Sequence, residues 1–321
     1  MARREVEFRV EDGTLLRGYL HAPADLPAPG VVMAHGFSGV KEQIDHYAAR
    51  FAERGFAVLV HDHRGFGSSE GAPRHELDPA RQLSDWQDAV TFALTQPEFR
   101  PEGRVGIWGS SFAGGLAMVL AANDPRVGSV VAQIPNVSGH RNGRQMFNVE
   151  QRARLRAAFA ADRRARAQGA APATIPVFTS DPGELCALPP AVTPRYLQAI
   201  SAMTPTWSNE VTLRSLEHAL EFEPAGWVPH VAPTPLLMIV GENDTCTFPE
   251  IQLEVYVSAR EPKRLVVHPG GHFDTYVDHF DLTSEAAVEW FHDHLTSGAR
   301  EGAGGPRPDH DNRQEDRNAH V

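Results

Sequence analysis

Residues 105–115 read Val-Gly-Ile-Trp-Gly-Ser-Ser-Phe-Ala-Gly-Gly, and this stretch decides the fold of the chain. The apolar run that ends at Trp108 predicts a short strand, and the small residues after it predict a sharp turn. Residues 116–122, Leu-Ala-Met-Val-Leu-Ala-Ala, then predict a helix that is buried on most of its faces. The stretch therefore predicts a strand, a tight turn that carries two serines, and a buried helix.

Only one of the two adjacent serines suits the tip of such a turn. A serine held between strand and helix has a strained backbone, and the residues two before and two after it are pressed together, so both must be small. For Ser111 these neighbours are Gly109 and Ala113. For Ser110 they are both bulky aromatic residues. We therefore predict that Ser111 stands at the tip of the turn and that Ser110 packs beside it.

The composition is that of one large globular domain, alone or with an insertion. The chain has 321 residues, of which 41% are hydrophobic and 22% charged, and its formal net charge is −11. A nucleic-acid-binding protein would usually be basic, so no nucleic-acid partner is expected. The polar N-terminus and the lack of a run of about 18 apolar residues predict a cytoplasmic protein without a membrane span. Cys186 and Cys246 are too few for a disulfide framework and are expected to be free thiols.

Further apolar runs predict strands that alternate with helices. A β-hairpin is expected over residues 4–22, with its turn at Asp12-Gly13. The expected buried strands are residues 31–35, 57–60, 127–134, 235–240 and 264–268. The expected helices are residues 42–54 and 83–94, with a closing helix capped by Ser284. This alternation predicts an α/β fold, with a mostly parallel twisted sheet and helices on both of its faces.

The alternation stops between residues 137 and 228. This segment holds an Arg-rich stretch of helical character at 145–166, a proline-rich stretch at 170–195 and another helix at 208–220. The arginines are expected to cover a solvated helix face, with an anionic substrate as the alternative. The predicted division is a core at 1–136 and 229–297, a mainly helical cap or lid at 137–228 and a disordered tail at 298–321.

Three residues with complementary chemistry each follow the end of a predicted parallel strand. They are Ser111, Asp244 and His272. The carboxyl ends of parallel strands form one rim where ligands bind, so these side chains are expected to converge. A serine hydroxyl is a poor nucleophile unless a base lies within hydrogen-bond reach. Glu242 is the alternative acid, although it lies closer to its strand, and His268 is the alternative base, although it lies on its strand.

These motifs resemble those of serine hydrolases of the α/β-hydrolase superfamily. The segments that carry the resemblance are HGFSG at 35–39, DHRGFGSS at 62–69, GSSFAGG at 109–115, GENDTCTFP at 241–249 and PGGHFDTY at 269–276. The chain is similar, over residues 5–297, to the dienelactone-hydrolase-like and Xaa-Pro-dipeptidyl-peptidase-like esterase branches. Ala113 stands where the usual G-x-S-x-G motif has glycine, and its methyl group enters a tight contact.

The resemblance implies a catalytic triad of Ser111, Asp244 and His272. In such a triad the histidine takes the serine proton and the aspartate orients the imidazole. The backbone N–H groups of Phe37 and Phe112 would then form the oxyanion hole. The implied function is hydrolysis of a carboxylic ester, or of a thioester or lactone, through an acyl-enzyme. No cofactor and no metal are expected.

Two other functions stay open. The same triad could serve a carbon–carbon bond hydrolase or a polyketide-type cyclase, because the fold alone does not fix the reaction. A non-catalytic small-molecule binding protein is the third alternative, and the intact Ser, His and acid argue against it. The expected partner is a small-molecule acyl substrate, and a homodimer stays open.

Two other patterns are interpreted structurally. Asp62, in the D-x-R-G-x-G-x-S segment, is expected to brace its loop through backbone N–H groups. His61 and His63 have the spacing of a metal pair, but no Cys or carboxylate stands at ligand spacing beside them. Residues 309–311, Asp-His-Asp, could bind a metal loosely, and no functional site is expected there.

Overall fold

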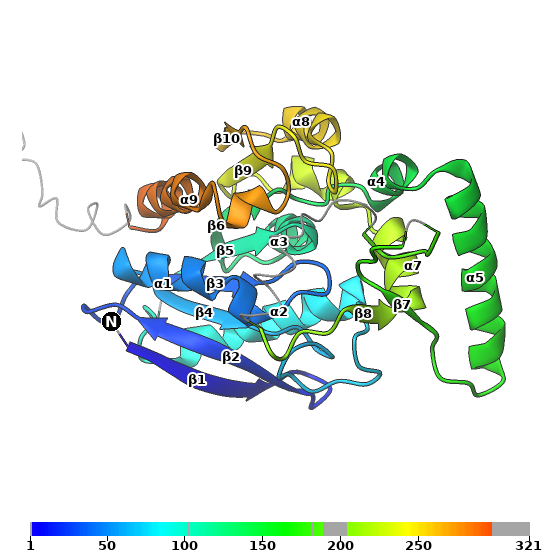
Figure 1. The fold of residues 1–321 in the computed structure, drawn as a ribbon. Coiled ribbons are helices and arrows are strands. Elements are labelled where there is room, and N and C mark those ends of the chain that lie inside the picture. The colour runs from blue at the N-terminus through cyan, green and yellow to red at the C-terminus, as the bar shows by residue number, and fades with distance from the viewer. Residues whose placement is uncertain (1, 102, 182, 189–203, 297–321) are drawn as a thin grey trace, which may run out of the picture.

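The computed structural model describes residues 2–101, 103–181, 183–188 and 204–296, and its main feature is an 8-stranded sheet in the order β1-β2-β4-β3-β5-β6-β9-β10 (Figure 1). The strands are β1 (Ala2–Arg9), β2 (Leu15–Ala22), β3 (Gly30–Ala34), β4 (Ala57–His61), β5 (Val105–Ser110), β6 (Val127–Gln133), β9 (Leu236–Gly241) and β10 (Lys263–His268). β2 pairs antiparallel with β1 and with β4, and the other pairings are parallel. The predicted hairpin and mostly parallel sheet are confirmed.

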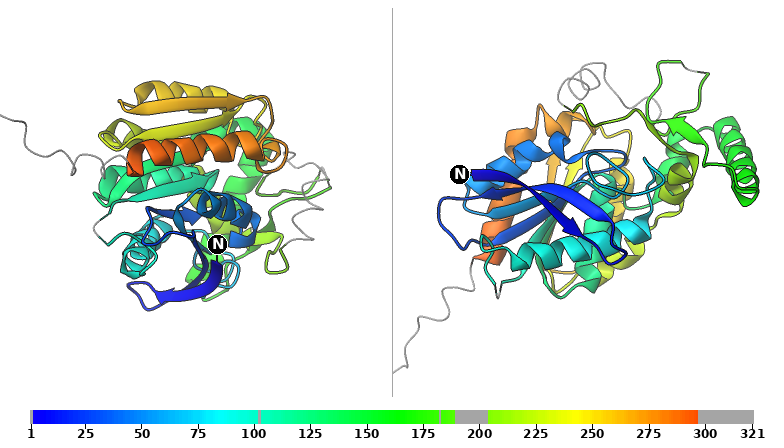
Figure 2. Two further views of the ribbon diagram at one scale, coloured as in Figure 1. Left: turned by 90° about the vertical axis from the view of Figure 1, so that its left-hand side faces the viewer. Right: turned by 90° about the horizontal axis from the view of Figure 1, so that it is seen from below.

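Helices cover both faces of this sheet (Figure 2). On one face lie α1 (Asp45–Glu53) and α9 (Phe280–Leu295), and on the other lie α2 (Pro79–Thr95), α3 (Phe112–Asn123) and α8 (Pro249–Ser258). Alternate residues of the central strands enter two separate hydrophobic cores, as expected of strands covered on both sides. Among the described residues, no helix combines the length and the apolar character needed to cross a membrane.

Several helix starts differ from the sequence predictions. α1 begins at Asp45 rather than at 42, and the helix predicted over 208–220 begins at Leu213, after a short strand. α2 begins at Pro79 rather than at 83, because the Asp78 carboxylate caps it by accepting from the N–H groups of the first turn. The predicted cap Ser284 is wrong, since α9 begins at Phe280 and Ser284 lies inside the helix. A capping serine would accept from backbone N–H groups of the first turn. The Ser284 hydroxyl instead donates to the carbonyl of Asp281 (3.3 Å), three residues earlier in the same helix.

Residues 137–228, here called the inserted segment, leave the sheet between β6 and β9. Its elements are α4 (Gly139–Met146), α5 (Val149–Ala167), β7 (Thr174–Pro176), β8 (Glu210–Thr212), α7 (Leu213–Glu221) and the 3₁₀ helix η2 (Pro224–His230). The Arg-rich stretch at 145–166 is therefore not one helix, because Asn148 starts α5 with a capping box. α5 stands out from the body in Figures 1 and 2. The predicted disordered tail, with residues 309–311, lies outside the described residues.

The loop after β4 is braced by Asp62, as predicted. One carboxylate oxygen accepts from the Lys41 backbone N–H (2.7 Å), and the other accepts from the Ser68 N–H (2.9 Å) and the Lys41 ammonium (2.7 Å). A Cβ on Gly67 would overlap this carboxylate, so the second glycine of the motif is required. Asp62 and Lys41 are both buried, so a local turn motif also holds a buried ion pair.

Replacing Asp62 by asparagine should destabilise the protein by about 3 kcal/mol, because it leaves the buried Lys41 ammonium without one of its charge partners. Glu42 still lies 2.9 Å from that ammonium and limits the loss. Urea unfolding followed by tryptophan fluorescence measures the change in the free energy of unfolding. The matched control is Asp281→Asn, which removes a carboxylate that is 88% exposed and paired with Arg50. Equal losses in the two variants would contradict the prediction.

Candidate active site

Ser111 occupies a strained turn between β5 and α3. Its backbone angles are φ 58° and ψ −120°, a region that residues other than glycine rarely adopt and that costs about 1–3 kcal/mol. A Cβ on Gly109 would overlap the carbonyl group of Ala113. The predicted requirement for a small residue is therefore confirmed at position 109, and the methyl group of Ala113 is accommodated at the other.

Backbone hydrogen bonds hold this turn in place. The Ser111 N–H donates to the carbonyl of Gln133 on β6 (2.8 Å), and the Ser111 carbonyl accepts from the N–H of Asn136 (2.9 Å). Ser110 is fully buried, and its hydroxyl bonds to the hydroxyl of Tyr276 (2.7 Å). Ser110 therefore packs beside the turn, as predicted, while Ser111 keeps some exposure.

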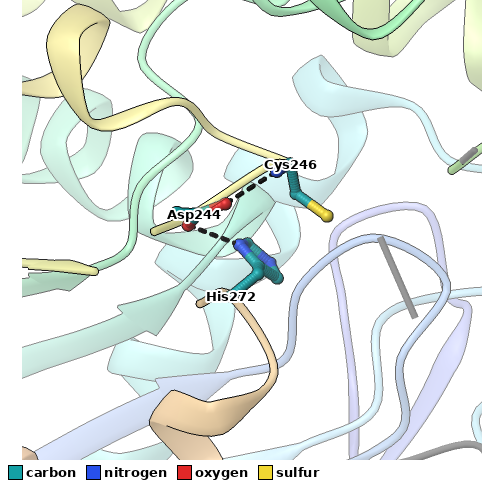
Figure 3. Close-up of side chains that lie close together, drawn as sticks. All are labelled: Asp244, Cys246 and His272. Atoms are coloured by element: carbon teal, nitrogen blue, oxygen red, sulfur yellow. Dashed lines mark hydrogen bonds and ion pairs between the residues drawn. The ribbon is translucent and has the colours of Figure 1, made fainter. Parts of the chain in front are cut away.

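His272 lies between Ser111 and Asp244. Its Nε2 is 2.9 Å from the Ser111 hydroxyl oxygen, and its Nδ1 is 2.7 Å from the Asp244 carboxylate. The three residues follow β5, β9 and β10, so the carboxyl ends of these parallel strands bring them to one rim of the sheet. Figure 3 shows the Asp244 carboxylate facing the imidazole. Asp244 and His272 are 3% and 5% exposed, which shields their contact from water.

The Asp244 carboxylate is held by four hydrogen bonds. One oxygen accepts from the N–H groups of Cys246 (2.7 Å) and Thr247 (2.9 Å). The other oxygen accepts from the Thr247 hydroxyl (2.7 Å) and from His272 Nδ1 (2.7 Å). Burial would raise the pKa of Asp244, but the charge of His272 and these hydrogen bonds outweigh it, so the pKa lies below its ordinary value. The carboxylate is therefore ionised at neutral pH.

Thr247 was not singled out from the sequence. It stands three residues after Asp244, the spacing at which a hydroxyl can bond back to an Asp side chain in a turn. Its hydroxyl, which donates to Asp244, also lies 3.1 Å from the carbonyl oxygen of Ile134, next to the end of β6, so its one proton is shared between the two acceptors. The Asp-x-x-Thr spacing is therefore the only sequence pattern that could have pointed to Thr247, and this spacing is too common to identify a site by itself.

The alternative acid and base lie elsewhere. The Glu242 side chain is exposed and makes no hydrogen bond to His272. His268 is buried, where its Nε2 bonds to the hydroxyl of Thr275 (2.9 Å) and its Nδ1 accepts from the Gly270 N–H (3.2 Å). Burial, with the charge of the neighbouring His279, lowers the pKa of His268 to about 4. Neither residue reaches Ser111.

The two N–H groups expected to form an oxyanion hole lie on the segments that flank Ser111. Phe112 is the first residue of α3, so its N–H belongs to the positive end of that helix. Phe37 follows Gly36, where a Cβ would lie 3.0 Å from the Ser111 Cβ. Within the described chain, neither N–H has a hydrogen-bond acceptor. Both donors are therefore available beside the serine.

Two cavities meet at Ser111. The described residues common to both walls are Phe37, Ser111, Leu188 and His272. The first cavity runs under the inserted segment, and its further walls are Phe112, Asn136, Gly139, Asn142, Gly143, Met146, Ala187, Leu216, Ala219, Leu220, Cys246 and Thr247. The walls of the second include Phe178, Trp207 and Tyr276. Each leaves about 500 Å³ of space that no protein atom fills, a figure that includes space open to the solvent.

The arginines of α5 lie away from these cavities. Arg163 pairs with Glu217 (2.8 Å), and Arg166 pairs with Asp162 within the helix (2.8 Å). No described residue of α5 lines either cavity beside Ser111. The arginines therefore do not face this site.

The potential metal ligands beside Ser111 are engaged in other contacts, whereas the ring nitrogens of His61 and His63 have no hydrogen-bond partner within the described residues. Asp244, Cys246 and His272 offer donor atoms within 4.8 Å of one another (Figure 3), but both carboxylate oxygens already accept two hydrogen bonds each. A metal ion there would have to displace these bonds. His61 and His63 are buried with ring centres 5.6 Å apart, and burial lowers the pKa of His61 to about 3.

Comparison with known proteins identifies the family. A sequence profile of the family described as X-Pro dipeptidyl-peptidase (S15 family) matches residues 12–274. The polyketide transferase ATR5 of Stachybotrys chlorohalonatus is 32% identical over 83% of this chain and 88% of its own length. The thiohydrolase aneE of Aspergillus aculeatus is 33% identical over 81% of this chain and 83% of its own length.

The solved structures give the same result. The crystal structure of the α/β hydrolase GrgF from Penicillium sp. sh18 matches 92% of this chain and all of its own with a TM-score of 0.81 and 27% identity. The resemblance to the Xaa-Pro-dipeptidyl-peptidase-like branch is thereby confirmed, and the α/β-hydrolase fold with it. The chain belongs to the X-Pro dipeptidyl-peptidase (S15) family and is an enzyme of the α/β-hydrolase type.

Proposed function

We propose that this protein is a serine hydrolase that cleaves an acyl ester or thioester through an acyl-enzyme on Ser111. The proposal rests on the unbroken hydrogen-bonded chain from Asp244 through His272 to Ser111, at 2.7 Å and 2.9 Å. A serine on a strained turn, a base within reach and an ionised orienting acid are the parts that activate a hydroxyl for attack on a carbonyl carbon.

Each residue has one role in the proposed reaction. His272 Nε2 takes the Ser111 proton as the oxygen attacks the carbonyl carbon, and then gives that proton to the leaving alcohol or thiol. Asp244 holds the proton on Nδ1, so that Nε2 is free to accept. The N–H groups of Phe37 and Phe112 bind the developing oxyanion, and each such donor contributes about 3–4 kcal/mol to lowering the barrier. Water then attacks the acyl-enzyme, with His272 as the base again.

We assign the acyl chain to the first cavity and the inserted segment to the role of a cap. α4 and α7 supply much of that cavity's wall, and most of the lining is apolar. An apolar wall suits a hydrocarbon chain rather than a charged substrate. The second cavity, on the other side of Ser111, would hold the leaving group. Relatives named thiohydrolase favour a thioester among the acyl substrates.

A panel of acyl substrates tests the proposal. It pairs p-nitrophenyl esters with N-acetylcysteamine thioesters of the same acyl chains, and a fluorophosphonate probe followed by peptide mass analysis locates the reactive serine. We expect turnover of medium-length acyl thioesters and a single label on Ser111. Absence of both turnover and label would remove the proposal and leave a binding protein on this fold.

Acyl transfer is the second candidate function. Relatives of 30–32% identity are named polyketide transferases, and a cavity partly walled by the inserted segment would reduce access of water to an acyl-enzyme. In that reaction the acyl group would pass to a second substrate, or to a hydroxyl of its own chain, in place of water. Labelling of Ser111 together with slow deacylation, speeded by added alcohols or amines, would favour this candidate over hydrolysis.

A further inference from the structure

α4 presents one face to the first cavity, and that face carries a single polar side chain. The residues that line the cavity are Gly139, Asn142, Gly143 and Met146, which have the spacing of one helix face. The opposite face, with Arg144 and its neighbours, is exposed. Asn142 is thus the polar member of a stripe that otherwise consists of glycine and methionine.

Asn142 is held rigidly in this wall. A Cβ on Gly139 would overlap the Ala219 carbonyl, and one on Gly143 would overlap the Leu220 side chain, so α4 lies directly against α7 on both sides of Asn142 (Figure 1). Its amide nitrogen donates to the side-chain oxygen of Asn136, 2.8 Å away, and Asn136 lines the same cavity. Packing and this hydrogen bond together fix the position of the amide.

The other end of the Asn142 amide has no partner. Asn142 is 4% exposed, and its Oδ1 is buried without a hydrogen bond in the described part of the chain. A buried amide oxygen normally accepts a hydrogen bond, and the α7 residues that line the same cavity are the apolar Leu216, Ala219 and Leu220. If both amides of the Asn136–Asn142 pair were rotated, the unpartnered atom of Asn142 would be its nitrogen instead. Either assignment leaves one polar atom of Asn142 unsatisfied.

We propose that the Asn136–Asn142 pair is a binding site for a hydroxyl group on the acyl chain of the substrate. This inference rests on the proposed acyl hydrolase function and narrows its substrate to hydroxylated acyl chains. A hydroxyl both donates and accepts, so it satisfies Asn142 in either amide assignment. A plain hydrocarbon chain in the same cavity would leave the amide unpaired, and a site built for a polar group discriminates against such an analogue.

Matched thioesters test this inference. The octanoyl thioester of N-acetylcysteamine is compared with a series of hydroxyoctanoyl thioesters. The members of this series are isomers of one another, and each carries its hydroxyl at a different position from carbon 3 to carbon 7. We expect kcat/KM of the wild type to be about tenfold higher for one or two hydroxyl positions than for the plain chain, the effect of one hydrogen bond. Asn142→Leu, similar in volume, should lose this preference, so that its kcat/KM values for the hydroxylated and plain chains become about equal.

The controls separate the inference from the function on which it rests. Met146→Leu changes the same helix face without touching a polar group, and it should keep the hydroxyl preference. Urea unfolding followed by tryptophan fluorescence reports whether each variant is folded, and Asn142→Ala replaces Asn142→Leu if the latter does not fold. A wild type that hydrolyses all the thioesters equally, or an Asn142 variant that keeps the preference, overturns the inference alone. A wild type that hydrolyses none of them counts against the proposed function.

Discussion

Replacing Ser111 by alanine should lower kcat by about 10⁶-fold, because the acyl-enzyme can no longer form. The fold should survive, since an alanine at this position would keep the same backbone hydrogen bonds to Gln133 and Asn136. Alanine has the same difficulty as serine in adopting the positive φ of this turn, so the strain is unchanged. The measurement is kcat on the best ester or thioester of the panel, with the free energy of unfolding from urea titration.

The adjacent serine provides the matched control. Ser110→Ala removes a hydroxyl of the same kind one residue away, but that hydroxyl bonds to Tyr276 in the core and is fully buried. We expect a loss of about 1 kcal/mol in the free energy of unfolding, with kcat reduced far less than in Ser111→Ala. If Ser110→Ala instead abolished turnover and Ser111→Ala did not, the assignment of the nucleophile would be reversed.

The sequence was sufficient for the sheet and for the convergence of Ser111, Asp244 and His272. Buried parallel strands are continuous apolar runs, and their order fixes which loops share a rim. The choice between Ser110 and Ser111 followed from steric reasoning on Gly109, and the structure bears out that contact. Local motifs with one strong physical requirement were therefore the most predictable part of the chain.

Predictions failed where tertiary contacts override local chemistry. Serine is a common capping residue, but Ser284 lies inside α9. The strands β7 and β8 have three residues each, which is too short for an alternating pattern to show in the sequence. α8 was missed because its apolar residues lie on both of its faces: Leu253 and Val257 are exposed, whereas Ile251 and Val255 are buried. No sequence motif marks Asn142. Its burial, which distinguishes it, follows from the packing of α4 against α7.

Asp244→Asn should lower kcat by about 10⁴-fold while leaving the position of His272 nearly unchanged. The asparagine oxygen would keep the two backbone donors, Cys246 and Thr247, so the amide nitrogen would face His272. That nitrogen donates, so Nδ1 must accept and the ring proton moves to Nε2, toward Ser111. The imidazole would then have no lone pair facing the serine hydroxyl, and it could not act as the base.

Glu242→Gln is the control for this variant, because Glu242 is the other carboxyl of the same loop and is exposed. It should leave kcat almost unchanged, whereas equal losses in the two variants would contradict the assignment of the acid. The pH dependence of stability gives a second test. Since the pKa of Asp244 is lowered in the folded protein, its ionised form stabilises the fold fully above about pH 4, and this contribution is lost as the pH falls toward the folded-state value. The difference in the free energy of unfolding between wild type and Asp244→Asn should therefore shrink below about pH 4, and a difference that grows there would show that Asp244 is not held as a carboxylate.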